Sequence, residues 1–400
     1  MRIQSIPPLL RYYGSFLQPD VAKIRLGLGG AAPGGNDFHL DAAAEWICRA
    51  QDAHPGGGVA RSYSLVYNPY FGRRGWIPPY PETTGYIIPT MFDYAHRSGR
   101  QEAFERAVRM AEWECEVQMA SGAVQGGTVD QAPTPAIFNT GQVIFGWIRA
   151  FQETGRERFL ESATRAGGFL LESQAADGAW RKHLSEYASS TMASYTYNTR
   201  TAWALLLLST VTGEPRFREA AVRNIDHALG QQLENGWFAS NCLYDPARPL
   251  LHTIAYAIRG VMECGAILDN REYLAGARKA ADALLGQVRE DGSLAGCFDD
   301  RWQPAASWSC LTGDAQIAHI WGRLCQITGE EKYREGARRT IDFLKRVQLL
   351  ATEDPGIRGG IGGSDPISGR YGRYEILNWA VKFFMDALMI DASLAEREAR

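Results

Sequence analysis

The sequence repeats a helix-forming motif at intervals of 55 to 60 residues. Each copy has an aromatic residue, then small residues, then arginine or lysine, and the aromatic positions are Phe104, Phe159, Phe217, Tyr273 and Tyr333. A glycine turn precedes four copies, at Gly99, Gly155, Gly213 and Gly329, and Asp269 with Asn270 stands before the remaining one. Glycine or asparagine suits the left-handed position that ends a helix. Self-similarity at a fixed period is typical of a fold built from repeated supersecondary units.

Each motif helix is predicted to end at a glutamine that is followed by a glycine-containing turn. The glutamines are Gln51, Gln118, Gln174, Gln232, Gln287 and Gln348. The first of them closes a sixth helix of this kind, predicted over residues 40–51. Because these helices carry a charged face, we expect them on the outside of the fold.

Six further helices of different composition alternate with the motif helices. They are predicted to begin at Thr83, Asn139, Asn198, His252, Leu311 and Glu375. Most open with threonine, asparagine or a similar residue, for which helix capping is the expected structural role. They are apolar nearly all round, and a helix that is apolar on every side is buried on every side. Six inner and six outer helices in alternation predict an all-α fold in the form of a closed double ring.

This pattern resembles the (α/α)6 toroid, the six-hairpin barrel shared by many glycoside hydrolases, polysaccharide lyases and sugar epimerases. The resemblance covers residues 40–390, nearly the whole chain of 400 residues. A ring of repeats has no internal boundary, and the N-terminal helix must pair with the last inner helix to close it. We therefore predict one toroid domain over residues 39–392. Residues 1–38 are expected to be an N-terminal extension across a rim, and residues 393–400 a C-terminal tail.

Composition and charge exclude several classes of function. With 45% hydrophobic residues and a net charge of −3, the chain can bury a large core and has no charge-based affinity for nucleic acid. The longest apolar stretch, residues 202–211, is half the length of about 20 residues that a membrane span needs. The first residues lack the apolar core of a secretory signal, so the default location is cytoplasmic, or periplasmic or extracellular if a signal was removed. The seven histidines are dispersed, and neither a metal nor a cofactor is expected.

The first turns of the inner helices and the loops before them are predicted to form a substrate site. Those loops are long and rich in aromatic residues and glycine, which suits the flat apolar faces of sugar rings. The catalytic candidates are Glu82, Tyr197, Asn198, Arg200, His252 and Tyr256. The substrate-binding candidates are Tyr86, Gln142, Tyr195, Trp237, Asp314, Gln316, Tyr371, Tyr374, Glu375 and Asn378. Helix capping does not explain why large polar side chains recur at the same depth of several otherwise apolar helices.

The residue types at this site suit proton abstraction next to the carboxylate of a uronic acid. Such a reaction needs a base near that carbon and positive or hydrogen-bonding groups that neutralise the developing enolate. In this hypothesis Arg200 and Asn198 hold the carboxylate, while Tyr197, Tyr256 or His252 exchanges the proton. The same groups would serve a β-eliminating polysaccharide lyase or a C5-epimerase, and the sequence does not separate the two.

Three other interpretations stay open. Glycoside hydrolysis needs two carboxyl groups, for which Glu82, Asp314 and Glu375 are candidates. Residues 174–180 (QAADGAW) match the Q-x3-G-x-W repeat of triterpene cyclases, although the acidic motif of those enzymes does not occur. A toroid that binds glycans without catalysis is the third interpretation.

Phrases such as YPETTGYIIPT, YNTRTAWAL and CLTGDAQIAHIW are similar to bacterial toroid proteins associated with exopolysaccharide gene clusters. That resemblance implies a carbohydrate substrate, and together with the residue types of the site it leads us to expect an acidic oligo- or polysaccharide.

Overall fold

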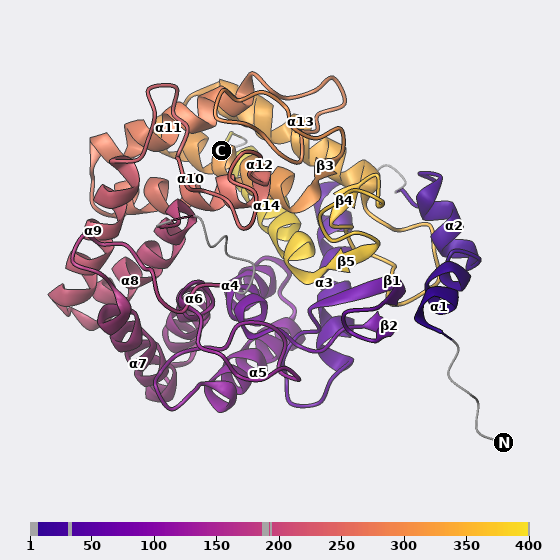
Figure 1. Cartoon of the computed structure of the whole chain (residues 1–400), viewed down its shortest axis with the longest axis horizontal. Coiled ribbons are helices and arrows are strands. Elements are labelled where there is room, and N and C mark those ends of the chain that lie inside the picture. The colour runs from indigo at the N-terminus through magenta and orange to yellow at the C-terminus, as the bar shows by residue number, and fades with distance from the viewer. Residues whose placement is uncertain (1–6, 31–33, 186–191, 193, 399–400) are drawn as a thin grey trace.

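The computed structural model describes residues 7–30, 34–185, 192 and 194–398. Within these residues, six inner and six outer helices form two concentric rings, which confirms the predicted all-α (α/α)6 toroid (Figure 1). The inner helices are α4 (Pro81–Ser98), α6 (Ile137–Thr154), α8 (Thr199–Thr212), α10 (Leu251–Ile267), α12 (Leu311–Thr328) and α14 (Asn378–Glu398). The outer helices are α3 (Asn36–Asp52), α5 (Gln101–Val117), α7 (Glu157–Ser173), α9 (Pro215–Leu229), α11 (Arg271–Leu285) and α13 (Glu331–Val347).

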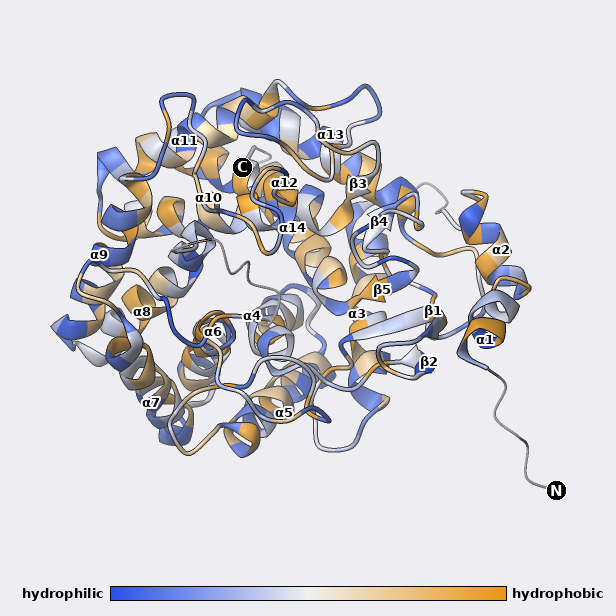
Figure 2. Ribbon diagram, viewed as in Figure 1, coloured by the Kyte–Doolittle hydropathy of each residue, from blue (hydrophilic) through white to orange (hydrophobic). Residues whose placement is uncertain are grey.

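The ring closes between the first and the last helices of the toroid. Each inner helix packs against the next along the chain, and α14 packs against both α3 and α4. The inner helices are largely apolar, whereas the outer helices turn hydrophilic faces outward (Figure 2). Among the described residues, no helix is both long enough and apolar enough to cross a bilayer.

Five of the six repeated glutamines connect one outer helix to the next, and the exception is Gln287. The amide of Gln118 donates to the carbonyl of Gly122 in its own turn and to that of Ser162 on α7, and Gln174 and Gln232 do the same one and two repeats later. Gln348, at the end of α13, donates to the carbonyl of His39 on α3 and so closes the outer ring. These contacts explain the glutamine–glycine repeat as a structural element of the ring.

The glycines of the repeat have two roles: they adopt a left-handed backbone conformation, and they allow two backbone segments to approach closely. Gly99, Gly155, Gly213 and Gly329 take the predicted left-handed conformation after the inner helices, with φ between 66° and 73°. In the remaining copy, however, Asp269 takes the positive φ of 50°, and Asn270 instead caps α11 through its side chain. In the glutamine turns, Gly178 has φ 86° and lies against the backbone of α9, where a Cβ would meet the carbonyl of Arg223.

The expected capping role of the threonines on the inner helices is wrong. The side chains of the N-cap residues of α4, α6, α8, α10 and α12 make no capping hydrogen bond. Instead, the fourth residue of three inner helices accepts a backbone N–H from the preceding loop. The pairs are Thr84 with Val59, Thr140 with Val124, and Asp314 with Leu294. These side chains therefore fix the loops that form the mouth of the ring.

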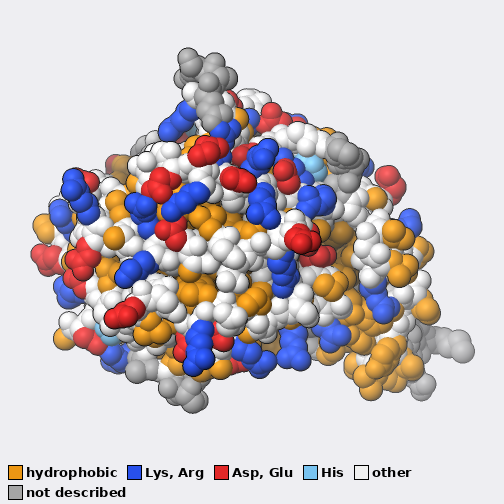
Figure 3. Space-filling model, turned by 90° about the horizontal axis from the view of Figure 1, so that it is seen from above, with side chains coloured by type: hydrophobic (Ala, Val, Ile, Leu, Met, Phe, Trp, Pro, Cys, Tyr) orange, Lys and Arg blue, Asp and Glu red, His pale blue; other side chains and the backbone are white. Residues whose placement is uncertain are grey.

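Short strands complete the rim at the N-terminal ends of the inner helices. β1 (Ser62–Asn68) pairs antiparallel with β2 (Arg73–Trp76) and with β5 (Glu375–Leu377), and β3 (Ser309–Cys310) pairs with β4 (Ser364–Asp365). The N-terminal helices α1 (Pro8–Ser15) and α2 (Pro19–Arg25) lie outside the double ring, and α1 packs on β1 (Figure 1). This segment exposes large apolar side chains, which gather at one side of the surface in Figure 3.

Candidate active site

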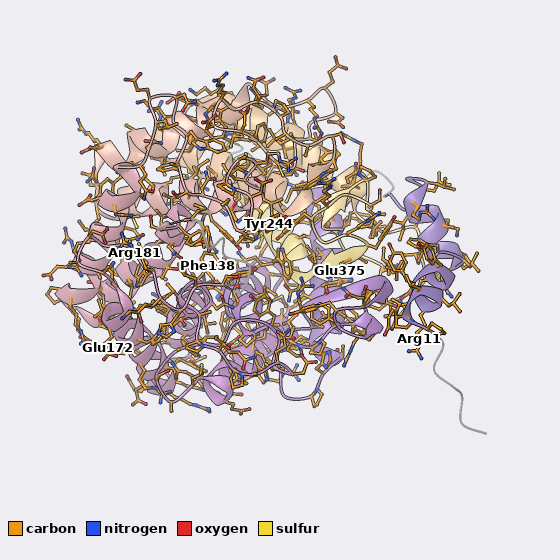
Figure 4. The ribbon with its side chains drawn as sticks, in the orientation of Figure 1. Arg11, Phe138, Glu172, Arg181, Tyr244 and Glu375 are labelled. Atoms are coloured by element: carbon orange, nitrogen blue, oxygen red, sulfur yellow. The ribbon has the colours of Figure 1, made fainter. Side chains whose placement is uncertain are left out.

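A cavity of about 260 Å³ lies at the N-terminal ends of the inner helices, and we call it the mouth cavity. Its wall is strongly aromatic: Phe71, Tyr80, Tyr86, Phe138, Tyr197, Tyr244, Tyr256, Tyr371 and Trp379 line it. Figure 4 shows Phe138 and Tyr244 near the ring axis, whereas Arg11 and Glu172 lie at the periphery. Aromatic faces with a few convergent polar groups are typical of small-molecule sites.

Six of the residues predicted from the sequence line this cavity. They are Glu82, Tyr86, Tyr197, His252, Tyr256 and Tyr371. They come from α4, α10, the short 3-10 turn η1 (Thr196–Asn198) and the loop before β5, so segments far apart in the sequence meet here. The toroid brings them together because the inner helices all begin at the same rim.

Glu82 supplies a carboxyl group that changes its charge near neutral pH. Burial disfavours its charged form and raises the pKa of Glu82 to about 7, against the opposing effects of a hydrogen bond from Tyr80 and of Arg200 and Arg61. Of the described residues that line the mouth cavity, Glu82 alone is a carboxylic acid. A group with a pKa near the working pH is suited to both donating and accepting a proton.

His252 is a neutral imidazole with a fixed orientation. Burial lowers the pKa of His252 to about 4, although the hydrogen bond to Gln316 acts in the opposite direction. The Nδ1 atom lies 2.7 Å from Oε1 of Gln316. Because an amide oxygen only accepts, Nδ1 carries the proton, and Nε2 keeps a lone pair. Gln316 therefore positions His252 and does not line the cavity itself.

Arg61 is a cation of the mouth cavity that the sequence analysis missed. Its guanidinium donates to the carboxylate of Glu375 and lies 5.2 Å and 5.0 Å from the ring centroids of Phe71 and Trp379. Ser62 and Asn68 also donate to Glu375, so this predicted substrate-binding residue acts by holding Arg61. The pairing of β1 with β5 brings the two charges together across 314 residues, a distance over which no local pattern gives a signal.

The tyrosines of the cavity stay protonated and act as hydrogen-bond donors. Burial raises the pKa of Tyr197 and of Tyr256, and burial together with the neighbouring Tyr256 raises that of Tyr86. The hydroxyl of Tyr256 lies beside that of Tyr86, and each of the two side chains contributes to the pKa shift of the other. Asn139, beside Tyr80, is a further amide of this cavity.

Arg200 lies behind the aromatic wall and not in the mouth cavity. Its Nε donates to Oε1 of Gln142, 2.6 Å away, and its guanidinium carbon is 5.2 Å from the centroid of Tyr256. It lines a second cavity on the ring axis. Asn198 is buried at the start of α8 and also lies outside the mouth cavity. The structure therefore does not bring Arg200 and Asn198 to the place where they would hold a substrate carboxylate in the mouth.

Five other predicted residues lie outside the mouth cavity. Asp314 accepts the N–H of Leu294 and the hydroxyl of Ser309, and burial raises the pKa of Asp314 to about 8. The other four pack within the protein: Trp237 against Trp302, Tyr195 against Tyr197, Tyr374 against Phe16, and Asn378 against Ala60 and Thr83. These side chains hold the rim together, because the loops of the rim pack on one another and on the first turns of the inner helices.

No metal site emerges among the described residues. They contain no group of three or more histidine, cysteine, aspartate or glutamate side chains placed to hold an ion. The donors of the mouth cavity are one carboxyl, one imidazole, hydroxyls and amides, a set suited to hydrogen bonding and proton transfer.

Comparison with known proteins identifies the fold. No protein-family model matches the chain, and no curated protein matches it in sequence. Among solved structures, an unsaturated glucuronyl hydrolase specific for heparin matches with a TM-score of 0.71 and 16% identity, covering 90% of this chain and 98% of that one. The unsaturated glucuronyl hydrolase of Bacillus sp. GL1 matches with a TM-score of 0.69 and 15% identity, over 88% and 96% of the two chains. Cellobiose 2-epimerase of Bacillus thermoamylovorans matches with a TM-score of 0.68 and 13% identity, over 88% and 99%.

Proposed function

We propose that this protein is a carbohydrate-active enzyme that hydrolyses an unsaturated uronyl group from the end of an oligosaccharide, with Glu82 as the general acid. The single observation that carries the proposal is the carboxyl of Glu82, which is partly buried in the mouth cavity and whose pKa of about 7 leaves it partly protonated at neutral pH. The names of the structural neighbours, which include unsaturated glucuronyl hydrolases, support the choice of substrate class.

The charge and the size of the mouth cavity support an acidic terminal sugar. Arg61 and Arg370 both line the cavity. Glu375 balances the charge of Arg61, so Arg370 supplies the positive charge of the lining, against the titratable Glu82. The cavity volume of about 260 Å³ is slightly below the range of roughly 300–1,000 Å³ for sites that hold drug-sized ligands. The cavity is thus suited to one sugar ring at a chain end, and its tyrosines offer both flat faces and hydroxyl donors.

A single carboxyl group suffices for this reaction. In an unsaturated uronyl group the C4–C5 double bond is joined to the ring oxygen, so it is an enol ether. Transfer of the proton from Glu82 to C4 leaves positive charge shared between C5 and the ring oxygen. Water then adds to C5 and gives its proton back to the Glu82 carboxylate. The resulting hemiketal opens to a ketone at C5 and leaves a hemiacetal at C1. The hemiacetal then breaks down to an aldehyde, and its C1–O bond to the rest of the oligosaccharide is cleaved with a proton passing to the released hydroxyl. Hydrolysis of an ordinary glycoside would instead need a second carboxyl group.

The second candidate is a lyase or a C5-epimerase, which His252 favours. Its Nε2 lone pair makes it a base throughout the neutral range, because its pKa is lowered to about 4. Tyr197, which stays protonated, would supply the proton to the opposite face or to the leaving group. In this scheme Arg61 would neutralise the enolate.

One spectrophotometric experiment separates the candidates. The protein is incubated with unsaturated uronyl oligosaccharides and, separately, with intact uronic-acid polysaccharides, and the ultraviolet absorbance of the conjugated double bond is followed. Falling absorbance with the first substrate supports the hydrolase, and rising absorbance with the second supports a lyase. Incorporation of deuterium from heavy water without a change in absorbance supports an epimerase. Binding without any turnover would contradict both enzymatic proposals and support the glycan-binding toroid.

Variants and the pH profile identify the group that moves the proton. Glu82→Gln should reduce kcat of the hydrolase by roughly 10²- to 10⁴-fold, the usual contribution of a general acid. His252→Ala and Tyr197→Phe should retain a larger share of the activity. Hydrolysis should decline above about pH 7, where Glu82 loses its proton. If His252 is instead the base, activity should rise through about pH 4 and stay level through neutral pH.

A further inference from the structure

A second and larger cavity of about 620 Å³ lies on the ring axis behind the mouth cavity, and we call it the axial cavity. Residues from all six inner helices line it, and Tyr86 lines both cavities. The exposed side chains of Asp93, Gln152 and Thr210 place its opening at the rim of the short glycine turns. A ligand can therefore enter the axial cavity without passing through the mouth.

Most of the basic residues in the axial cavity have an acidic partner. The pairs are Arg149 with Asp93 and Glu153, Arg259 and Arg323 with Glu263, Lys382 with Asp386, and Arg97 with Asp37 and Glu396. Arg200 differs, since among the described residues its side chain has Gln142 as a hydrogen-bond partner and no carboxylate as an ion-pair partner. It is also 4% exposed. Buried charges in proteins are normally paired with an opposite charge, and Arg200 is not. The axial cavity has room for a bound anion that would pair with it.

Aromatic rings surround the guanidinium of Arg200. Its Cζ atom lies 5.2 Å from the ring centroid of Phe145, 5.4 Å from that of Trp203 and 5.5 Å from that of Phe383. Phe145 and Trp203 are themselves 4.5 Å apart and tilted by 55°. Ring faces attract a cation but carry no net charge, so they do not replace an anion. Together with the cation they form the combination that recognises a ring bearing a carboxylate.

We propose that the axial cavity is a second binding site for a monoanionic sugar acid, whose carboxylate pairs with Arg200 and whose ring packs against Trp203 and Phe145. A carboxylate matches the planar fork of a guanidinium through two parallel hydrogen bonds. A single carboxylate would give Arg200 the acidic partner that it lacks among the described residues. This site is independent of the reaction in the mouth. Sequence analysis predicted that Arg200 binds a substrate carboxylate in the mouth, whereas the site proposed here lies on the opposite side of the aromatic wall.

The test is a calorimetric and thermal-unfolding titration with sodium glucuronate, with glucose and sodium chloride as parallel ligands. Because glucuronate can also occupy the mouth, the titration is made in the Arg61→Met variant, in which the mouth lacks its paired cation. We expect glucuronate to bind that variant and raise its Tm, while glucose and chloride at equal concentration do not. Adding Arg200→Met should weaken glucuronate binding at least tenfold.

A second substitution keeps the proposal testable if the Arg200→Met variant does not fold. Trp203 is partly exposed to the cavity. Trp203→Leu, in the Arg61→Met background, should weaken glucuronate binding severalfold and leave the weaker binding of acetate unchanged, because acetate has a carboxylate but no ring.

Equal protection by chloride would overturn the assignment of a sugar acid. Unchanged glucuronate binding after Arg200→Met would overturn the site itself. Neither result bears on turnover in the mouth, so a failure here is distinguishable from a failure of the proposed function.

Discussion

Replacing Glu82 with glutamine should stabilise the protein while it removes the proposed acid. Burial raises the pKa of Glu82 from 4.5 to about 7, a difference of about 2.5 units. One pKa unit corresponds to about 1.4 kcal/mol, so the ionised carboxyl lowers the free energy of unfolding by at most about 3 kcal/mol. Glutamine has nearly the same shape and no charge to desolvate. The variant should therefore regain most of this free energy wherever the wild-type carboxyl is ionised.

The gain depends on pH in a defined direction. Because the pKa is higher in the folded protein, the carboxyl is favourable below pH 4.5 and becomes unfavourable as pH rises through 7. From these two values, glutamine should stabilise by about 1 kcal/mol at pH 5 and by about 3 kcal/mol at pH 8.5. With an unfolding entropy of about 2.1 cal/mol/K per residue, the larger value corresponds to a rise in Tm of about 4 °C.

Thermal and urea unfolding of the wild type and Glu82→Gln at the two pH values provides the measurement. Glu375→Gln is the matched control, since Glu375 is ion-paired with Arg61 and its neutralisation should destabilise the protein. A stability gain for Glu82→Gln that is equal at pH 5 and pH 8.5 would refute the reasoning. So would a loss of stability at pH 8.5, because it would mean that the ionised carboxyl is stabilised in the fold.

Two further predictions concern side chains that the structure assigns to the framework. Gln348→Ala should lower the free energy of unfolding by about 3 kcal/mol in urea titrations, because it removes hydrogen bonds to the Gly359 and His39 carbonyls and to the His39 ring. Gln287→Ala is its control, since no hydrogen bond of that side chain is found within the described residues, and an equal loss in both variants would contradict the role given to the closing glutamine. Asp314→Asn should keep kcat/KM of the proposed reaction within about threefold, because that carboxyl binds Leu294 outside the mouth; a loss of 100-fold would return Asp314 to the site.

Residue spacing predicted the toroid because each copy of the repeat can be recognised from a short stretch of sequence. The aromatic motif marks five outer helices, the closing glutamine marks the sixth, and the apolar composition of the other six marks them as inner helices. Predicted and observed starts of the inner helices differ by at most three residues, as for Glu375 against Asn378 in α14. The repeat also placed the glutamines correctly at the helix ends, although their partners on the neighbouring helices became visible only in three dimensions.

The site was predictable where its residues belong to the first turns of the inner helices. Glu82, Tyr86, His252 and Tyr256 stand at such positions, and the ring geometry requires them to converge. The direction in which each side chain extends from its helix could not be predicted from the sequence. Arg200 also begins an inner helix, yet its long side chain extends behind the aromatic wall to Gln142 and the axial cavity. Asp314 looked like a catalytic carboxylate and instead holds a loop, as Thr84 and Thr140 do at the same position of their helices.

The sequence by itself determined the number, order and polarity of the helices, because helix periodicity, turn glycines and apolar faces are local properties of the chain. Only the tertiary structure decided which charges meet. Arg61 joins Glu375 through the pairing of two strands, and Glu82 acquires its raised pKa from the burial that the closed ring imposes. Charge pairing and desolvation depend on distances between segments far apart in sequence, and those distances exist only after the ring has closed.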